Sequence, residues 1–187
     1  MRGQAPLEGA MHATTILALR RNGQVVMVGD GQVTLGDVVM KHRARKIRRL
    51  HHDSVLAGFA GSAADGITLL DRFDAQLQQT NGQLRRAAVD LAKEWRTDRF
   101  LRRLEAYLLA ASVEAILCLS GDGEVIEPDE DVVAIGSGGA YAQAAATALM
   151  RHTEMEAVEI ARAAMRIAGE MCIYTNTDLV LERLPSQ

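Results

Sequence analysis

The residues with the clearest chemical potential are two threonines, Thr14 and Thr15, at the start of a β-prone run that extends to Leu19. A threonine hydroxyl is a weak nucleophile unless a base lies beside it, and a free N-terminal amine is one such base. An α-amino group titrates at about pH 7.7–8.0, so it can accept a proton at neutral pH. This chemistry requires removal of residues 1–13, so that Thr14 begins the chain. Taken alone, a threonine at a strand start is more often structural.

A basic segment between Lys41 and Arg49 contains candidates for the second group that this chemistry needs. A lysine ammonium close to the amine would hold the amine neutral by like-charge repulsion. If the segment is a strand, Lys46 and Arg48 share one face and Arg45 and Arg49 the other, and most of these side chains are solvated. The run is short, lacks interleaved aromatic residues and belongs to a chain of net charge −3, so nucleic-acid binding is not expected.

A glycine-rich segment, residues 136–139, follows a predicted strand and precedes a predicted helix. It lacks the third glycine of a dinucleotide fingerprint and the lysine of a P-loop, so a nucleotide site is not expected. Its amides and the Ser137 hydroxyl could instead orient a substrate or an amine at a helix N-terminus. The histidines show no helical i, i+4 pair, and His51 and His52 would point to opposite sides of a strand, so a zinc site is not expected either.

The hydrophobic pattern predicts the elements that must position these residues. Strands are expected at 14–19, 24–28, 54–61, 115–119, 124–126 and 132–135, helices at about 62–80, 140–151 and 156–169, a helical region at about 84–111, and a closing strand or hairpin at 172–181. Asn22 and Gly23, between the first two strands, are a strong hairpin signal. The helical stripe shifts phase near Thr97 and Asp98, which indicates two helices or one bent helix. This order favours an α+β fold with segregated layers.

Composition limits the class of protein. The chain has 187 residues, of which 48% are hydrophobic and 24% charged, which is typical of a single globular domain. Two cysteines, Cys118 and Cys172, cannot form a disulfide framework, and a reducing compartment fits them. No run approaches the roughly 18–20 apolar residues of a membrane span, and residues 1–13 lack the apolar centre of a secretory signal. A cytoplasmic protein is expected.

Six short motifs occur in order along the chain. They are TTI at 14–16, GDGQVTLG at 29–36, AGFAG at 57–61, EWRTDR at 94–99, AIGSGG at 134–139 and CIYTN at 172–176. Together they resemble the bacterial relatives of proteasome β subunits, within the N-terminal nucleophile hydrolases. The resemblance implies a four-layer αββα sandwich, a leader at 1–13 and a single peptidase domain at 14–187. It also implies a threonine-type endopeptidase that takes part in ATP-dependent proteolysis.

The resemblance implies roles for individual residues. Thr14 would be the nucleophile that forms an acyl-enzyme, Lys46 the active-site lysine and Asp30 the acid that pairs with it. The backbone amide of Gly58 would stabilise the oxyanion, and Ser137 would lie near the threonine amine.

A structural sodium ion is also implied, bound by backbone oxygens of Gly169, Cys172 and Thr175. Hard cations prefer oxygen ligands, so carbonyl groups in a tight turn suffice. The alternative at this place is simply a helix C-terminus that ends at Gly169.

The implied partners are further copies of the chain, arranged as two stacked hexameric rings, and an AAA+ ATPase that binds the nucleotide and delivers unfolded protein. Members of the family often have a shorter leader, and Met11 is an alternative start. Two other functions are considered, an inactive ring subunit and a small-molecule amidase of the same superfamily. An inactive subunit should have lost Thr14, Lys46 or Asp30, and all three are present. An amidase would more often begin with cysteine or serine.

Overall fold

The computed structural model describes residues 14–35, 38–61, 63–99, 101 and 106–185. The strands in these ranges are β1 (Thr15–Arg21), β2 (Gln24–Asp30), β3 (Val33–Leu35), β4 (Val38–Lys41), β5 (Ile47–Leu50), β6 (Val55–Gly61), β7 (Ala106–Ala111), β8 (Ile116–Ser120), β9 (Val125–Ile126), β10 (Val132–Gly136) and β11 (Leu179–Leu184). The helices are α1 (Ala63–Gln79), α2 (Leu84–Thr97), α3 (Gly139–His152) and α4 (Ala157–Met171). The predicted leader, residues 1–13, lies outside the described residues, so the domain boundary at residue 14 stays a prediction.

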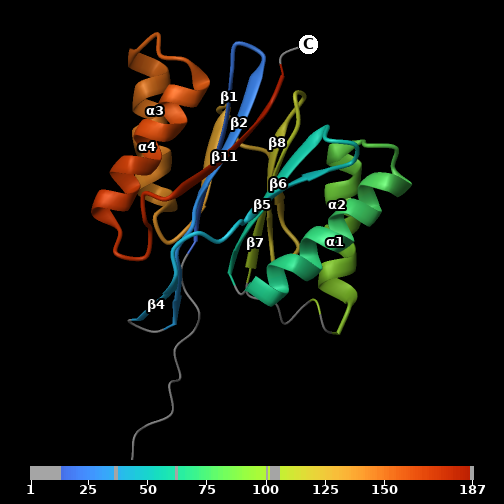
Figure 1. The fold of residues 1–187 in the computed structure, drawn as a ribbon. Helices are drawn as coiled ribbons and strands as arrows, with labels where there is room; N and C mark the ends of the chain where they lie inside the picture. The colour runs from blue at the N-terminus through green and yellow to red at the C-terminus, as the bar shows by residue number, and fades with distance from the viewer. Residues whose placement is uncertain (1–13, 36–37, 62, 100, 102–105, 186–187) are drawn as a thin grey trace, which may run out of the picture.

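The elements form four layers (Figure 1). One sheet has the strand order β10-β1-β2-β11 and the other the order β5-β6-β7-β8-β9. Helices α3 and α4 cover the outer face of the first sheet, and α1 and α2 cover the outer face of the second. The strands β3 and β4 form a separate hairpin at one end of the sandwich. The α+β class and the αββα order expected from the sequence are confirmed.

Strand β1 is apolar on both faces because both faces are covered. Ile16 and Ala18 pack in the core between the two sheets, whereas Leu17 and Leu19 pack against α3 and α4, and all four are 0% exposed. Burial of an aliphatic side chain of this size stabilises the fold by about 1.5–3 kcal/mol. The start of this strand, where Thr14 lies, is therefore anchored from two sides.

The first hairpin is formed as its sequence predicts. Asn22 and Gly23 have φ angles of 52° and 75°, the left-handed backbone that a tight two-residue hairpin turn requires. The turn sets the register of β1 against β2, which pairs Arg21 with Gln24 and, at the far end, Ile16 with Gly29. One residue further along, the Thr15 amide donates a hydrogen bond to Asp30 Oδ1. The turn thereby places the threonine pair beside an acidic residue.

The helical region predicted for residues 84–111 is wrong in its second half. Helix α2 ends at Thr97, and residues 106–111 form β7, which pairs with β6 and β8. Leu108 and Ala110 face α1 and α2, while Leu109 and Ala111 face the other sheet. A strand covered on both faces loses its alternation of apolar and polar residues, so its leucines fit a helical spacing equally well. The phase shift near Thr97 marks the end of the helix.

The basic segment is also not one continuous strand. Only residues 47–50 form β5, and residues 42–46 have no regular structure beyond a bend. The predicted alternation therefore does not apply to Lys46, which is buried, whereas Arg48 is exposed and pairs with Asp71. His51 and His52 lie in the turn after β5, both at positive φ, rather than on a strand.

The closing segment is shorter than predicted. Residues 172–174 form no strand, and β11 is confined to Leu179–Leu184, where it pairs with β2. None of the helices in the described ranges is long and apolar enough to span a membrane.

Candidate active site

Thr14 lies directly ahead of β1 and is 4% exposed. Its carbonyl oxygen accepts a hydrogen bond from the Ser137 amide at 3.0 Å. The neighbouring Gly136 has a φ of 92°, and a Cβ atom there would lie 1.8 Å from the Thr14 carbonyl oxygen. Glycine is therefore required at this position, because both the backbone angle and the close approach exclude a side chain. Thr14 is held by its backbone, independently of its hydroxyl.

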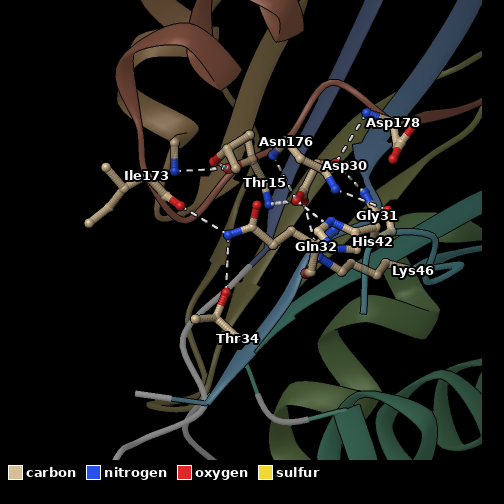
Figure 2. Close-up of polar contacts among 12 residues, drawn as sticks. Thr15, Asp30, Gly31, Gln32, Thr34, His42, Lys46, Ile173, Asn176 and Asp178 are labelled. Carbon is tan, nitrogen blue, oxygen red and sulfur yellow. Dashed lines mark hydrogen bonds and ion pairs between the residues drawn. The ribbon is translucent and has the colours of Figure 1, made fainter. Parts of the chain in front are cut away.

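Thr15 is held by three polar contacts. Its amide donates to Asp30 Oδ1 at 2.8 Å, its Oγ1 accepts from the Gly138 amide at 2.8 Å, and Oγ1 lies 2.7 Å from Thr175 Oγ1. The Thr15 hydroxyl thus points to the start of α3 and the loop after α4. Figure 2 shows this residue beside Asp30.

The Thr14 side chain is expected to face the opposite side from that of Thr15. Side chains alternate along extended backbone, so Thr14 shares the side of Ile16 and not that of Thr15. Ile16 packs in the core between the sheets, and its Cδ1 is 2.7 Å from where a Cβ of Gly58 would lie. The alternation of β1, continued by one residue, therefore predicts a Thr14 hydroxyl on the side of the second sheet and Gly58.

Lys46 and Asp30 form a buried ion pair. Lys46 Nζ donates to Asp30 Oδ1 at 3.1 Å and to the Gln32 carbonyl oxygen at 2.5 Å. The two side chains are 5% and 0% exposed. The other carboxylate oxygen, Asp30 Oδ2, accepts from the amides of Gln32 at 3.0 Å and Asn176 at 3.5 Å. Both carboxylate oxygens of Asp30 therefore accept hydrogen bonds, which fixes the orientation of this side chain.

The position of Lys46 affects its acidity. Burial lowers the pKa of the Lys46 ammonium below 10.5, and the charge of Asp30 and its hydrogen bond act in the opposite direction. Desolvation disfavours the charged form of a lysine, whereas a carboxylate beside it favours that form. The ion pair fixes the Lys46 side chain close to the start of β1, because Asp30 Oδ1 accepts from both Lys46 Nζ and the Thr15 amide.

Gly58 lies in the middle of β6, between β5 and β7. A Cβ at this position would lie 2.7 Å from Ile16 Cδ1 and 3.3 Å from the Lys46 carbonyl oxygen. The absence of a side chain leaves room at Gly58 for the Ile16 side chain of the first sheet and for the Lys46 carbonyl oxygen. Gly58 therefore lies close to the backbone of Lys46 and on the side to which Thr14 points.

The structure brings the five predicted catalytic residues to one end of the sandwich. Ser137 contacts Thr14 through the backbone, Lys46 contacts Asp30 directly, and Gly58 lies beside Lys46. Ser137 is exposed and begins the turn that leads into α3. Their chemical roles stay a prediction.

Sequence reasoning missed Gln32 and Asn176 as parts of this network. Gln32 supplies the carbonyl oxygen for Lys46, and its side-chain amide donates to Thr34 Oγ1 at 3.1 Å and to the Ile173 carbonyl oxygen at 2.9 Å. Asn176 contacts Asp30 from the loop after α4. Gln32 lies in the motif at 29–36 and Asn176 in the motif at 172–176, but neither the residue type nor the spacing predicts a place in this network.

The predicted cation ligands lie where α4 ends. The Cys172 amide donates to the Ala168 carbonyl oxygen at 2.8 Å, and the Thr175 amide donates to the Cys172 carbonyl oxygen at 3.0 Å, so the chain turns back under the helix. A Cβ at Gly169 would lie 3.2 Å from the Asn176 carbonyl oxygen. Carbonyl groups of a last helical turn carry partial negative charge. Backbone carbonyl oxygens of this kind fit a hard monovalent cation. Among the described residues, no cluster of three or more His, Cys, Asp or Glu side chains could hold a metal ion.

A four-layer αββα sandwich with a threonine at the start of an inner strand, beside a buried lysine, defines a proteasome-type hydrolase. The family model "Proteasome subunit" matches residues 10–183. The chain belongs to this family and is a hydrolase of its threonine peptidase type.

Sequence and structural similarity to known proteins supports membership of this family. The chain is 56% identical over 177 residues to the ATP-dependent protease subunit HslV of Syntrophobacter fumaroxidans, covering 95% of this chain and 99% of the relative. The crystal structure of eukaryotic HslV from Trypanosoma brucei matches with a TM-score of 0.87 and 50% identity, covering 91% of this chain and 98% of that one. Thiobacillus denitrificans BPH matches at 19% identity and a TM-score of 0.70, covering 92% of this chain and 98% of that one, which shows the fold alone.

Proposed function

We propose that this chain is the peptidase subunit of an ATP-dependent protease and that Thr14 is its nucleophile once residues 1–13 are removed. The observation that carries the proposal is the buried Lys46–Asp30 pair at the same end of the sandwich as the start of β1. Burying a charge of this kind destabilises the folded protein unless the charge is paired. Buried charged pairs are common at functional sites, where they shift the pKa of a neighbouring group. The comparisons support this function rather than an inactive subunit or a small-molecule amidase.

The proposed reaction is acyl transfer in two steps. The free amine of Thr14 takes the proton of its own hydroxyl, and Oγ1 attacks the scissile carbonyl carbon. The Gly58 amide stabilises the negative oxygen of the tetrahedral intermediate. As the C–N bond breaks, the proton passes to the leaving amine, and an ester joins Thr14 to the remaining peptide. Water then hydrolyses this ester.

The side chains around Thr14 prepare its amine for this role. The positive charge of Lys46, fixed by Asp30, disfavours protonation of the amine and so keeps it available as a base. The turn at Ser137 holds the Thr14 backbone, which limits the directions in which the hydroxyl can attack.

The proposed assembly is two stacked hexameric rings that act in the cytoplasm with the AAA+ ATPase HslU, which delivers unfolded proteins. A relative at 56% identity carries the name ATP-dependent protease subunit, which supports an ATPase partner. Mass measurement of the purified assembly and hydrolysis of an unfolded protein with and without HslU and ATP test this. Hydrolysis that is indifferent to HslU and ATP would argue against the partner.

We also propose that backbone oxygens of Gly169, Cys172 and Thr175 hold a sodium ion that stabilises the turn after α4. A ligand that binds only the folded state stabilises it by RT ln(1 + [L]/Kd). The melting temperature should therefore rise with sodium concentration, and should not rise with tetramethylammonium at equal ionic strength, because that ion cannot accept inner oxygen ligands. Equal melting temperatures in the two salts would contradict the site.

Maturation is the most direct test of the proposed nucleophile. Protein expressed from Met1 and protein expressed from Met11 should both yield a chain that begins at Thr14, measured by intact mass and N-terminal sequencing. Any other first residue in the active protein would overturn the mechanism, because the amine of Thr14 would still be a peptide nitrogen. A Thr14→Ala variant separates self-processing, which would then stop, from removal of the leader by an aminopeptidase.

A further inference from the structure

Asn176, in the loop between α4 and β11, joins three segments that are far apart in the sequence (Figure 2). Its Oδ1 accepts from the amides of Gly31 and Asp178, each at 3.2 Å. Its Nδ2 donates to the His42 carbonyl oxygen at 3.0 Å, and its backbone amide donates to Asp30 Oδ2 at 3.5 Å. One residue thus contacts the acid of the site, the residue after that acid, and the segment that leads to Lys46.

The segment that carries Lys46 depends on such contacts. Residues 42–46 form neither helix nor strand, so they have no regular ladder of hydrogen bonds to hold them. The Ala44 amide donates to the Gly31 carbonyl oxygen at 2.9 Å, and a Cβ at Gly31 would lie 2.2 Å from the His42 carbonyl oxygen. The two backbones therefore lie against each other. Asn176 bridges them, with its oxygen on Gly31 and its nitrogen on His42.

We propose that Asn176 is a positioning residue for the peptidase reaction, which fixes the backbone on both sides of the Lys46–Asp30 pair. Asp30 is placed through the Asn176 amide and through Gly31, and Lys46 is placed through His42 and the rest of the segment. The proposal rests on the proposed function, because the lysine must lie at a set distance from the Thr14 amine. Asn176 itself need not touch the substrate.

The expected effect follows from the geometry that the reaction needs. Lys46 is buried and bound to Asp30 and to the Gln32 carbonyl oxygen, so a displacement of the 42–46 backbone or of Asp30 would change the position of the ammonium relative to the start of β1. A shift of about 1 Å in a catalytic constellation can lower a rate by about 10²-fold. Loss of Asn176 should consequently lower kcat, whereas KM should change little, because the residue does not bind the peptide.

The test uses the processed protease with its ATPase and two variants. Asn176→Ala removes all three side-chain contacts, to Gly31, Asp178 and His42. Asn176→Asp keeps an acceptor of the same size for the amides of Gly31 and Asp178 but cannot donate to His42. Sites that can still be acylated are counted with an irreversible peptide electrophile, and kcat is expressed per site. Both variants should lose at least about tenfold in kcat per site, with KM within about twofold of the wild type.

Asp74→Ala is the matched control. Asp74 Oδ1 accepts from the His51 amide at 3.0 Å, so it fixes the turn at the other end of β5, away from Lys46. This variant should keep the wild-type kcat per site. A purely structural role for Asn176 would lower the number of acylated sites and leave kcat per site unchanged, which would overturn the proposal. A loss confined to Asn176→Asp would also overturn it, since added charge would then be the cause.

The outcomes separate this proposal from the one on which it rests. If the wild-type protein is not acylated at Thr14, the proposed nucleophile is wrong. If it is acylated there and both Asn176 variants match it in kcat per site, only the positioning role is wrong.

Discussion

Thr14→Ala is expected to lower peptide hydrolysis by about 10³-fold or more, the range seen when a covalent nucleophile is removed. The variant lacks the oxygen that would form the acyl bond. Its fold should be retained, because the contact of Thr14 with the amide of Ser137 uses the backbone and not the side chain. Cleavage of a fluorogenic peptide, with circular dichroism and the mass of the assembly as checks on folding, measures both outcomes.

Two companion variants make this result specific. Thr14→Ser keeps a hydroxyl and should retain part of the activity. Thr15→Ala should lose less activity than Thr14→Ala, since the Thr15 hydroxyl is directed to Gly138 and Thr175 rather than toward Gly58. All variants should be expressed from a start codon placed directly before residue 14, so that leader removal does not depend on the substitution. Equal residual activity in the two alanine variants would contradict the assignment of Thr14.

Lys46→Met should have the second-largest effect, on activity and on stability together. It removes the ammonium and leaves Asp30, whose side chain is 0% exposed, as a buried charge without its partner. Breaking a buried ion pair in this way costs about 3–5 kcal/mol in the free energy of unfolding. The lower end is expected here, because amides of Thr15 and Gln32 still donate to the carboxylate. Urea unfolding and peptide hydrolysis measure the two effects separately.

A double variant and a control distinguish stability from chemistry. Lys46→Met combined with Asp30→Asn removes the unpaired charge and should regain part of the stability but none of the activity. Arg48→Met breaks the exposed pair with Asp71, whose side chains are 44% and 66% exposed, so it should change the unfolding free energy by less than about 1 kcal/mol and leave activity intact. Recovery of hydrolysis in the double variant would show that Lys46 acts only through folding.

The candidate site was predictable to the extent that its residues lie in local motifs. The hairpin turn at Asn22 and Gly23, followed by strands of fixed length, places Thr15 at Asp30 without any knowledge of the remaining chain. The glycines at 58 and 136 belong to motifs that resemble the family. Gln32 and Asn176 were not predictable in this way, because an amide side chain that accepts and donates to backbone has no preferred spacing.

Sequence alone determined the elements whose signals are local: the β1–β2 hairpin, helices α1, α3 and α4, and a threonine at a strand start. Only the tertiary structure decided that residues 106–111 form a central strand, because a strand that is covered on both faces does not alternate between apolar and polar residues. It also decided that Lys46 is buried while Arg48 is exposed. Burial and contacts between segments 134 and 145 residues apart, such as those of Asn176, depend on how layers pack, and no short stretch of sequence contains that information.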